Sequence, residues 1–373
     1  DQVWPLLRFT PDPSLRSLLI DQLGKMQTDP HLLAARLAVE PDPSIRRAII
    51  QSLGGLNGKN IRDTDRQRIA QQIEKLFRQD EDPGVHGSAS WLLGNWGRKL
   101  PDLPDSDRTE PLARRCPSWY VNSQKQTMVI LPSSADQNSR ATGHRFAVSG
   151  HEVTVRDFLR FRENHDYVQS EAPSESCPVN NVNWHLAAEY CNWLSEQAAI
   201  PRDQWVYERI SGASKGFVAK NDSSTLTGYR LPTNAEWRSA CLAGSTEAYC
   251  FGNSKSLLPR YAHFQTTQSW PVGLRLPNEA GLFDMHGNVW EWTHDPFATP
   301  SRSGTFVRQR ICGGAYSTLP VLLTSDAGIV TERNKRSHNI GFRVARTIAG
   351  LLKSEARREF QSPAAEIPNH KAK

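Results

Sequence analysis

Two closely similar stretches near the start of the chain constrain its fold more than any other feature. They read PDPSLRSLLIDQLG at 11–24 and PDPSIRRAIIQSLG at 41–54, and a looser copy, EDPGVHGSASWLLGNWG, occupies 81–97. The Asp-Pro steps of the three copies are separated by 30 and then 40 residues. Self-similarity at such a period is typical of stacked helix pairs, in which no unit can bury its apolar face alone.

Each copy carries the signals of a helix. A proline stands near the start, where its missing N–H leaves no hydrogen bond unmade. Apolar residues then follow at helical spacing: Leu15, Leu18, Leu19 and Leu23 in the first copy, and Ile45, Ile49 and Leu53 in the second. We expect Gly24, Gly54 and Gly97 to end the helices as left-handed caps. Residues 1–97 are therefore predicted to form HEAT-like helical repeats; the alternative is a plain helical domain with coincidental turns.

The pattern changes after residue 97. Residues 98–118 hold four prolines among charged residues, which is typical of a linker. Beyond it, short alternating runs rich in Trp and Gly predict an α+β domain over 119–347, followed by a tail at 348–373. A length of 373 residues also exceeds what one compact core usually holds.

Three helices are predicted in the second domain. Thr154 is expected to cap a segment with Phe158 and Phe161 on one face. Asn181 or Asn183 precedes a buried helix that begins at Trp184, and Thr233 with Glu236 forms a capping box before a third helix. Strands are expected at 249–252, 311–314 and 341–345, whereas the polar segment 202–228 indicates a surface loop.

Composition narrows the function classes. The net charge is +6, but the basic residues late in the chain are mixed with glutamates, so nucleic-acid binding is not predicted. The sequence contains no run of about 18 apolar residues, the length that a membrane-spanning helix needs, so no membrane span is predicted. The six cysteines form no CxxC pair, so we expect free thiols, a reducing compartment and a cytoplasmic protein.

Five segments of the second domain carry a resemblance. They are HEVTVRDFLRF (151–161), CPVNNVNWHLAAEYCNWLSEQ (177–197), GYRLPTNAEWRSACLAG (228–244), PVGLRLPNEAGLFDMHGNVWEWTHD (271–295), and CGGAY (312–316) with NIGFRVA (339–345). In this order and spacing they resemble the formylglycine-generating-enzyme (sulfatase-modifying factor) family. The resemblance implies a C-type-lectin-like fold, with little regular structure and a small twisted sheet.

The family's catalytic residues are missing. In catalytic members, the resemblance implies, two cysteines after a GGS motif bind copper(I), and oxygen oxidises a cysteine of the target sulfatase. Counting from Gly313-Gly314, the serine position is Ala315 and the two cysteine positions are Thr318 and Leu323. Copper(I) needs soft thiolate ligands, so a copper site is not expected here. Cys312 is a single thiol at a different place, and enzyme activity is left uncertain, leaning towards none.

The family's structural calcium site keeps its residue types. The matching positions are Asp284, Gly287, Val289 and Glu291, which would supply two carboxylates and two backbone carbonyls. Calcium prefers such oxygen ligands, so a structural Ca²⁺ is a candidate cofactor. The alternative is that the two carboxylates serve a turn and an ion pair.

The resemblance also implies a ligand groove. Its lining would include Trp290, Ala315, Tyr316 and Thr318. For Trp290 and Trp292 we favour a place in the core beneath the groove. Arg343 is expected to form a buried ion pair or bonds to backbone carbonyls.

Several functions remain open. The favoured hypothesis is a non-catalytic module that binds a protein or peptide ligand, with the helical repeats docking a partner. Alternatives are a divergent formylglycine-generating oxidoreductase and a ligand-display protein of the retroelement-diversified type, which would vary over 315–338. Repeats followed by this domain also resemble bacterial proteins with a Ser/Thr kinase domain upstream. No kinase motif is present here, so we expect any such domain before Asp1.

Overall fold

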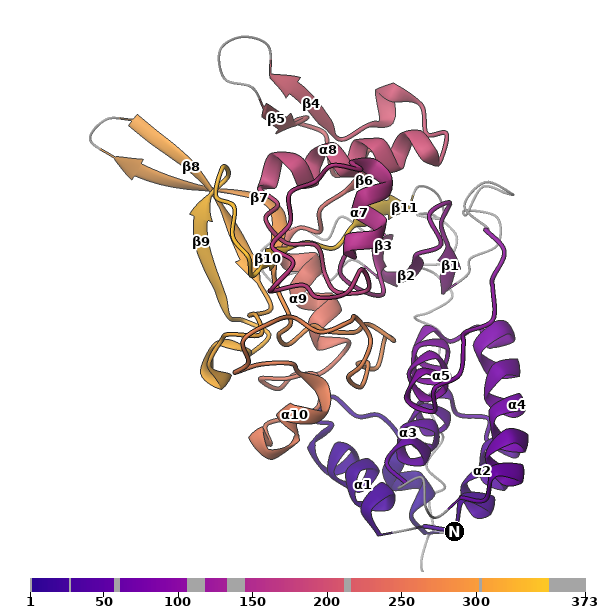
Figure 1. Ribbon diagram of the computed structural model, residues 1–373. Coiled ribbons are helices and arrows are strands. Elements are labelled where there is room, and N and C mark those ends of the chain that lie inside the picture. Colours follow the sequence, from indigo (N-terminus) through magenta and orange to yellow (C-terminus); the bar gives the residue numbers. More distant parts are fainter. Residues whose placement is uncertain are drawn as a thin grey trace, which may run out of the picture.

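The computed structural model describes residues 2–26, 28–56, 61–105, 118–132, 145–210, 216–301 and 304–348. The N-terminal part is helical (Figure 1). Its elements are η1 (Trp4–Leu7), α1 (Ser14–Lys25), α2 (Pro30–Val39), α3 (Pro43–Gly54), α4 (Asp63–Gln79) and α5 (Pro83–Asn95). The prediction of helices across this segment is confirmed. The assignment to the HEAT class stays a prediction.

The helices form a stack of two rows. In one row α3 packs between α1 and α5, while α2 and α4 pack on α3 and α5 from the other side (Figure 1). The repeated Asp-Pro step starts the helices of the first row, because the aspartate side chain accepts hydrogen bonds from the first turn. Asp42 accepts from the Ser44 amide at 2.8 Å, and Asp82 accepts from the Val85 amide at 2.8 Å.

The predicted glycine caps are correct at one position and wrong at two. Gly97 has a φ of +69° after the end of α5. Gly24 and Gly54 instead lie inside α1 and α3. Gly24 allows close approach of two backbones, because a Cβ there would stand 2.7 Å from the Cα of Gly55. This glycine is therefore needed where neighbouring repeats touch, and not for a left-handed turn.

The second part is built on three small sheets. A five-stranded sheet has the order β1 (Trp119–Val121), β2 (Thr127–Pro132), β3 (Arg145–Ser149), β11 (Ala345–Ile348) and β6 (Tyr229–Arg230). A four-stranded sheet has the order β10 (Ile340–Gly341), β7 (Trp290–Ser301), β8 (Gly304–Cys312) and β9 (Gly328–Glu332). The β7 and β8 strands extend as a long hairpin from the body (Figure 1). A short hairpin pairs β4 (Tyr207–Ile210) with β5 (Gly216–Ala219).

The three predicted helices are confirmed. They are α7 (Val155–Phe161), α8 (Trp184–Gln197) and α9 (Asn234–Leu242). Thr154 and Thr233 form capping boxes with Asp157 and Glu236, and Asn183, the second of the two candidates, caps α8. The remaining helical turns are η3 (Arg202–Gln204), η4 (Lys255–Leu257), α10 (Leu258–Tyr261) and η5 (Pro320–Leu322).

Two local predictions are wrong, and a third, the strand at 341–345, is only partly correct, because β10 ends at Gly341, β11 begins at Ala345 and 342–344 are not in a strand. Segment 202–228 is not a plain loop, because it contains η3 and the β4–β5 hairpin, and Phe217 of β5 is buried in the core beside α8. Segment 249–252 is not a strand, since Tyr249 and Gly252 form a single bridge across a turn. Its aromatic rings, Tyr249 and Phe251, are buried beneath the helical part.

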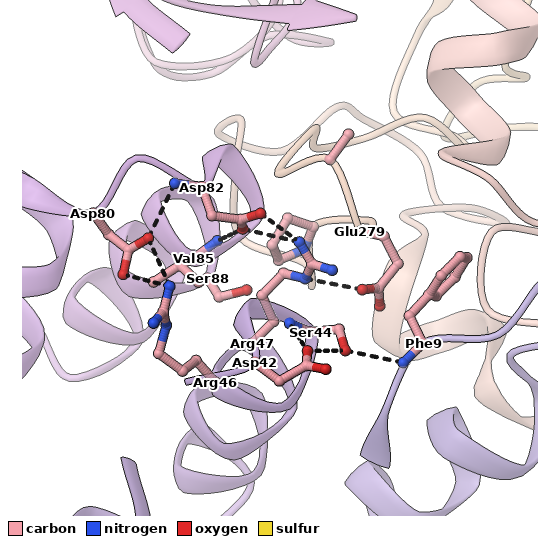
Figure 2. A network of polar contacts seen from close by, with 12 residues as sticks. Phe9, Asp42, Ser44, Arg46, Arg47, Asp80, Asp82, Val85, Ser88 and Glu279 are labelled. Atoms are coloured by element: carbon pink, nitrogen blue, oxygen red, sulfur yellow. Dashed lines mark hydrogen bonds and ion pairs between the residues drawn. The ribbon is translucent and has the colours of Figure 1, made fainter. Parts of the chain in front are cut away.

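The helical stack and the second part share one hydrophobic core. That core joins residues of α1–α5 to Tyr249, Phe251, Leu276 and Leu323. Polar contacts reinforce the junction. Arg47 forms ion pairs with Glu279 and Asp82 (Figure 2), and Glu279 also pairs with Arg16. The two parts therefore pack as one unit.

The predicted boundaries can be placed only in part. Residues 106–117 of the predicted linker 98–118, and residues 349–373 of the predicted tail, lie outside the described residues. In the described part, no helix is long and apolar enough to cross a membrane. The five cysteines of that part are free thiols, as predicted, and Cys116 lies outside it.

Candidate functional site

A buried ion pair lies at the centre of the second part. The Arg343 guanidinium donates to both carboxylate oxygens of Glu291, at 2.7 and 2.6 Å. It also donates to the backbone carbonyls of Ser149 and Phe283, and the Trp237 indole N–H donates to Glu291 at 2.7 Å. Both charged side chains are completely buried. The prediction that Arg343 forms a buried ion pair is confirmed.

A third and a fourth ionisable group share this centre. Glu152 was missed by the sequence reasoning, although it lies in a segment that carries the resemblance. It accepts hydrogen bonds from the Val289 amide at 3.1 Å and the Asn288 side chain at 2.9 Å. Burial and the nearby Asp284 and Glu291 raise the pKa of Glu152 well above its usual range. Burial raises the pKa of Asp284 to about 6.

These contacts bear directly on the predicted calcium ligands. Asp284, Gly287, Val289 and Glu291 lie in and just after one tight turn, where Asp284 has a φ of +57° and Gly287 of +132°. The carboxylate of Glu291 is already held by Arg343 and Trp237, and one oxygen of Asp284 accepts the Gly273 amide. A Ca²⁺ ion at Glu291 would therefore have to share this carboxylate with the Arg343 guanidinium. The calcium site stays a prediction.

Thr318 and Leu323, at the two cysteine positions after Gly313-Gly314, both have structural contacts. The Thr318 hydroxyl accepts the Ala315 amide at 2.9 Å, so it closes a turn of the backbone. Leu323 is completely buried, and one of its methyl groups would lie 2.2 Å from a Cβ on Gly314. The residue at the second cysteine position therefore fills the shared core between the two parts.

Two other thiols near this loop are buried and unreactive at neutral pH. Cys312 is at the end of β8, and Cys241 on α9 lies beside His286 and Ser325. Burial raises the pKa of each of these two thiols to about 12. A thiol with such a pKa is protonated at neutral pH, and the thiolate is the form that binds metals and attacks substrates.

The predicted groove residues come together, but they are buried. Trp290, Ala315, Tyr316 and Thr318 each expose less than a tenth of their surface. The Tyr316 hydroxyl contacts Glu171 and His338, at 2.7 and 2.6 Å. The side chains of Glu171 and His338 are partly exposed, and sequence reasoning gave no signal for either of them. Direct ligand contact by the four predicted residues stays a prediction.

The surface beside this loop is apolar. Leu319, Val321 and Leu322, around the short helix η5, expose 57%, 65% and 44% of their surface. These three exposed side chains give the surface around η5 an apolar character. Leu323, the fourth apolar residue of the run, points into the core instead.

A separate cavity lies between the two parts of the chain. It has a volume of about 240 Å³ and is lined by residues of α5, of 100–103 and of 149–157, including His86, His151 and Glu152. Burial lowers the pKa of both histidines to about 4, so they are neutral at pH 7. None of the predicted groove residues lines this cavity.

The second part of the chain is similar to known proteins. A model of the sulfatase-modifying factor enzyme 1-like domain matches residues 121–348, which is more than half of the chain. Among solved structures, Treponema denticola variable protein 1 aligns with a TM-score of 0.46 and 22% identity, covering 59% of this chain and 95% of that one.

Three relatives differ in how much of their length they share with this chain. The chaperone protein LppX of Paenibacillus barcinonensis is 27% identical over 249 aligned residues, covering 58% of this chain and 84% of LppX. The formylglycine-generating enzyme of Mycobacterium tuberculosis is 37% identical over 196 residues, covering 42% of this chain and 65% of the enzyme. The serine/threonine-protein kinase pkn1 of Chlamydia pneumoniae is 40% identical over 118 residues, covering 32% of this chain but 14% of the kinase.

The predicted fold class is confirmed: the chain is α+β, with N-terminal helices and a C-type-lectin-like domain. The five motif segments of that domain all fall within the matched range, and Arg343, Glu291 and Trp237 from three of them meet in its centre. This chain belongs to the sulfatase-modifying factor enzyme 1-like (formylglycine-generating-enzyme) family.

Proposed function

We propose that this protein is a non-catalytic binding module that recognises a protein or peptide on the surface around η5. One observation carries the proposal. The two positions that would hold copper are Thr318, whose hydroxyl closes a backbone turn, and Leu323, whose side chain is buried in the core. A domain that keeps the fold of its family but lacks the two copper-binding cysteines can still serve as a binding module.

The alternative of a divergent oxidoreductase would need other thiolates. Cys241 lies on α9 and contacts the Met285 carbonyl, and Cys312 contacts Asn234 at the start of α9. Burial raises the pKa of both thiols to about 12. A buried protonated thiol is a poor copper ligand and a poor nucleophile. The similarity to formylglycine-generating enzymes therefore supports the fold of this chain, whereas we do not extend their activity to it.

The surface around η5 has the character of an interface. Exposed Leu319, Val321 and Leu322 lie directly after Tyr316, whose hydroxyl contacts the partly exposed Glu171 and His338. Protein interfaces combine an apolar centre with polar groups at the rim. A ligand with apolar side chains and one hydrogen-bonding group would match both parts.

The relatives support this reading by what they are called. LppX is named as a chaperone and pkn1 as a kinase, so domains of this family occur in proteins that are not named for an oxidation. A Ser/Thr kinase domain elsewhere in the natural protein, a structural Ca²⁺ and a cytoplasmic location belong to the same proposal.

Two measurements test the proposal. The purified chain should bind no copper(I) and should not oxidise a CxPxR peptide under conditions in which the mycobacterial formylglycine-generating enzyme does. Bound copper with turnover would establish the oxidoreductase instead.

The second measurement addresses binding. Peptides selected from a displayed random library on the intact protein should lose at least about tenfold in affinity on Val321→Asp. They should be unaffected by Leu274→Asp, because Leu274 is similarly exposed at 52% but lies elsewhere in the domain. Equal effects of the two variants would remove η5 from the binding surface.

A further inference from the structure

Another pocket lies beside α8, where the β4–β5 hairpin packs against this helix (Figure 1). We call it the α8 pocket. Its volume is about 550 Å³, which is within the range usual for small-molecule sites. The lining combines five aromatic rings and six charged side chains with Asn192. Of the described residues, neither those of η5 nor the predicted groove residues line it, so it is separate from the proposed binding surface.

One face of α8 supplies a wall of the α8 pocket. Glu189, Trp193 and Glu196 are spaced four and three residues apart, so their side chains follow one another along the helix. Asn192 also lines the pocket, and its side chain donates to the Tyr207 carbonyl at 2.8 Å, which holds β4 against the helix. On this face the Trp193 indole therefore lies between two carboxylates.

At the Glu189 end, two arginines of the chain show how this wall binds a guanidinium. Arg162 and Arg209 each donate to the Glu189 carboxylate, at 2.9 and 3.0 Å. Each guanidinium also lies over a phenyl ring of the pocket lining. Arg162 is 5.3 Å from the centroid of Phe161, and Arg209 is 5.4 Å from that of Phe217. The same pair of groups, a carboxylate and an aromatic face, thus holds a guanidinium twice.

At the Glu196 end, the same two groups are present without a cation of the chain. Among the described residues, no arginine or lysine lies over Trp193, and Glu196 forms no ion pair. Trp193 is partly buried and Glu196 is exposed, so a ligand can reach both from solvent. Tryptophan is also the aromatic residue that attracts cations most strongly. The α8 pocket therefore offers one more guanidinium position than the chain's own arginines use.

The other charged groups of the lining leave this position negative. The Lys220 ammonium donates to the Asp203 carbonyl at 3.1 Å, and the Arg202 guanidinium lies over the Trp205 ring at 5.3 Å. Glu208 is a second exposed carboxylate of the lining that forms no ion pair with the described residues. Carboxylates without a partner favour a cationic ligand over an anionic one.

We propose that the α8 pocket binds a guanidinium group, which stacks on Trp193 and pairs with Glu196. A planar guanidinium satisfies both groups at once, because its face stacks on an indole while its N–H groups point towards a carboxylate. An ammonium group is a compact charge without such a face. The guanidinium belongs either to free arginine or to an arginine side chain of a polypeptide, and the experiment distinguishes these two sources.

Fluorine NMR of the intact protein labelled with 5-fluorotryptophan tests the proposal, with Trp193→Phe to assign the Trp193 signal. L-Arginine should shift this signal with a dissociation constant on the order of 1–10 mM, because a partly exposed ring and an exposed carboxylate each contribute little. L-Citrulline has a neutral urea in place of the guanidinium and should leave the signal unchanged. Glu196→Gln should raise the dissociation constant for arginine at least about threefold. Glu175→Gln is the matched control, because this carboxylate is 58% exposed but lies outside the pocket lining.

N-acetyl-L-arginine amide, which has no charged ends, distinguishes the two sources of the guanidinium. Equal or tighter binding of this compound than of arginine assigns the pocket to arginine side chains of a polypeptide, and weaker binding assigns it to the free amino acid. The proposal is overturned if neither compound shifts the Trp193 signal, or if citrulline shifts it as much as arginine does. It is also overturned if Glu196→Gln binds arginine as tightly as the parent protein, because the pairing with Glu196 would then be absent.

Discussion

Replacing Arg343 by methionine should be among the most destabilising single changes in this protein. The substitution removes the guanidinium from Glu291. Among the described side-chain donors, the Trp237 N–H then remains to the buried carboxylate. It also takes a donor from the carbonyls of Ser149 and Phe283. Breaking a fully buried ion pair typically costs about 3–5 kcal/mol, because the remaining charge has no counter-ion.

Urea unfolding followed by tryptophan fluorescence measures the effect, since Trp237 and Trp292 are completely buried in the native state. Adding Glu291→Gln to Arg343→Met should recover at least half of the lost free energy, because a neutral amide can still accept from Trp237. Arg156→Met is the control: its pair with Glu175 leaves both side chains more than half exposed, so the change should stay below about 0.5 kcal/mol.

The pH dependence of Arg343→Met has a defined sign. The Arg343 guanidinium lowers the pKa values of Glu152 and Asp284, which burial raises, so its removal should raise both further and let the native variant bind protons at a higher pH than the native wild type. The loss of stability should therefore be smaller near pH 5 than at pH 7. The reasoning is refuted if Arg343→Met costs less than about 1 kcal/mol, or if Glu291→Gln recovers nothing in its background.

Three further predictions follow from single positions. In chelator, the contribution of Asp284 to the wild-type free energy of unfolding should fall by up to roughly 3 kcal/mol as the pH rises from about 4 to above 6, because the pKa of Asp284 is about 6 and its ordinary value is 3.8. Asp284→Asn should remove this part of the slope. Added Ca²⁺ should raise the melting temperature of the wild type alone if the predicted site exists; equal melting with and without chelator would count against calcium. Gly87→Ala should cost about 1–3 kcal/mol in urea unfolding, because its Cβ would meet backbone of the second domain at 2.7 Å, whereas Gly94→Ala on the same helix meets nothing within 4 Å and should be neutral or stabilising. Cys241 and Cys312 should react with iodoacetamide at pH 8 far more slowly in the native than in the unfolded protein, since burial raises the pKa of each to about 12; similar rates would show an accessible thiolate.

Local signals in the sequence were sufficient wherever a few neighbouring residues decide the structure. The capping residues Thr154, Asn183 and Thr233 begin the helices predicted from them, because a cap satisfies amides of its own first turn. The Asp-Pro steps predicted the helices of the first row for the same reason. The segments quoted for the resemblance lie within residues 121–348 that match the family.

The signals failed where a distant segment decides the conformation. Gly24 was expected to end a helix, but it lies within one because the backbone of Gly55 touches it. The hairpin in 202–228 was missed because Phe217, not a run of apolar residues, fixes it to the core. Leu323 carries the strongest evidence against a copper site, and its burial depends on the packing of two parts of the chain.

The sequence by itself determined the local features of the chain. These are the helices of the N-terminal segment, the motif segments of the family, and the presence of Thr318 and Leu323 at the cysteine positions. Tertiary structure alone decided which charges meet, since Glu152, Glu291 and Arg343 come from segments far apart in the chain. It also decided that the N-terminal helices share a hydrophobic core with the second domain. The physical reason is that side-chain type and capping are local properties, whereas burial and the pairing of charges depend on which distant surfaces exclude water together.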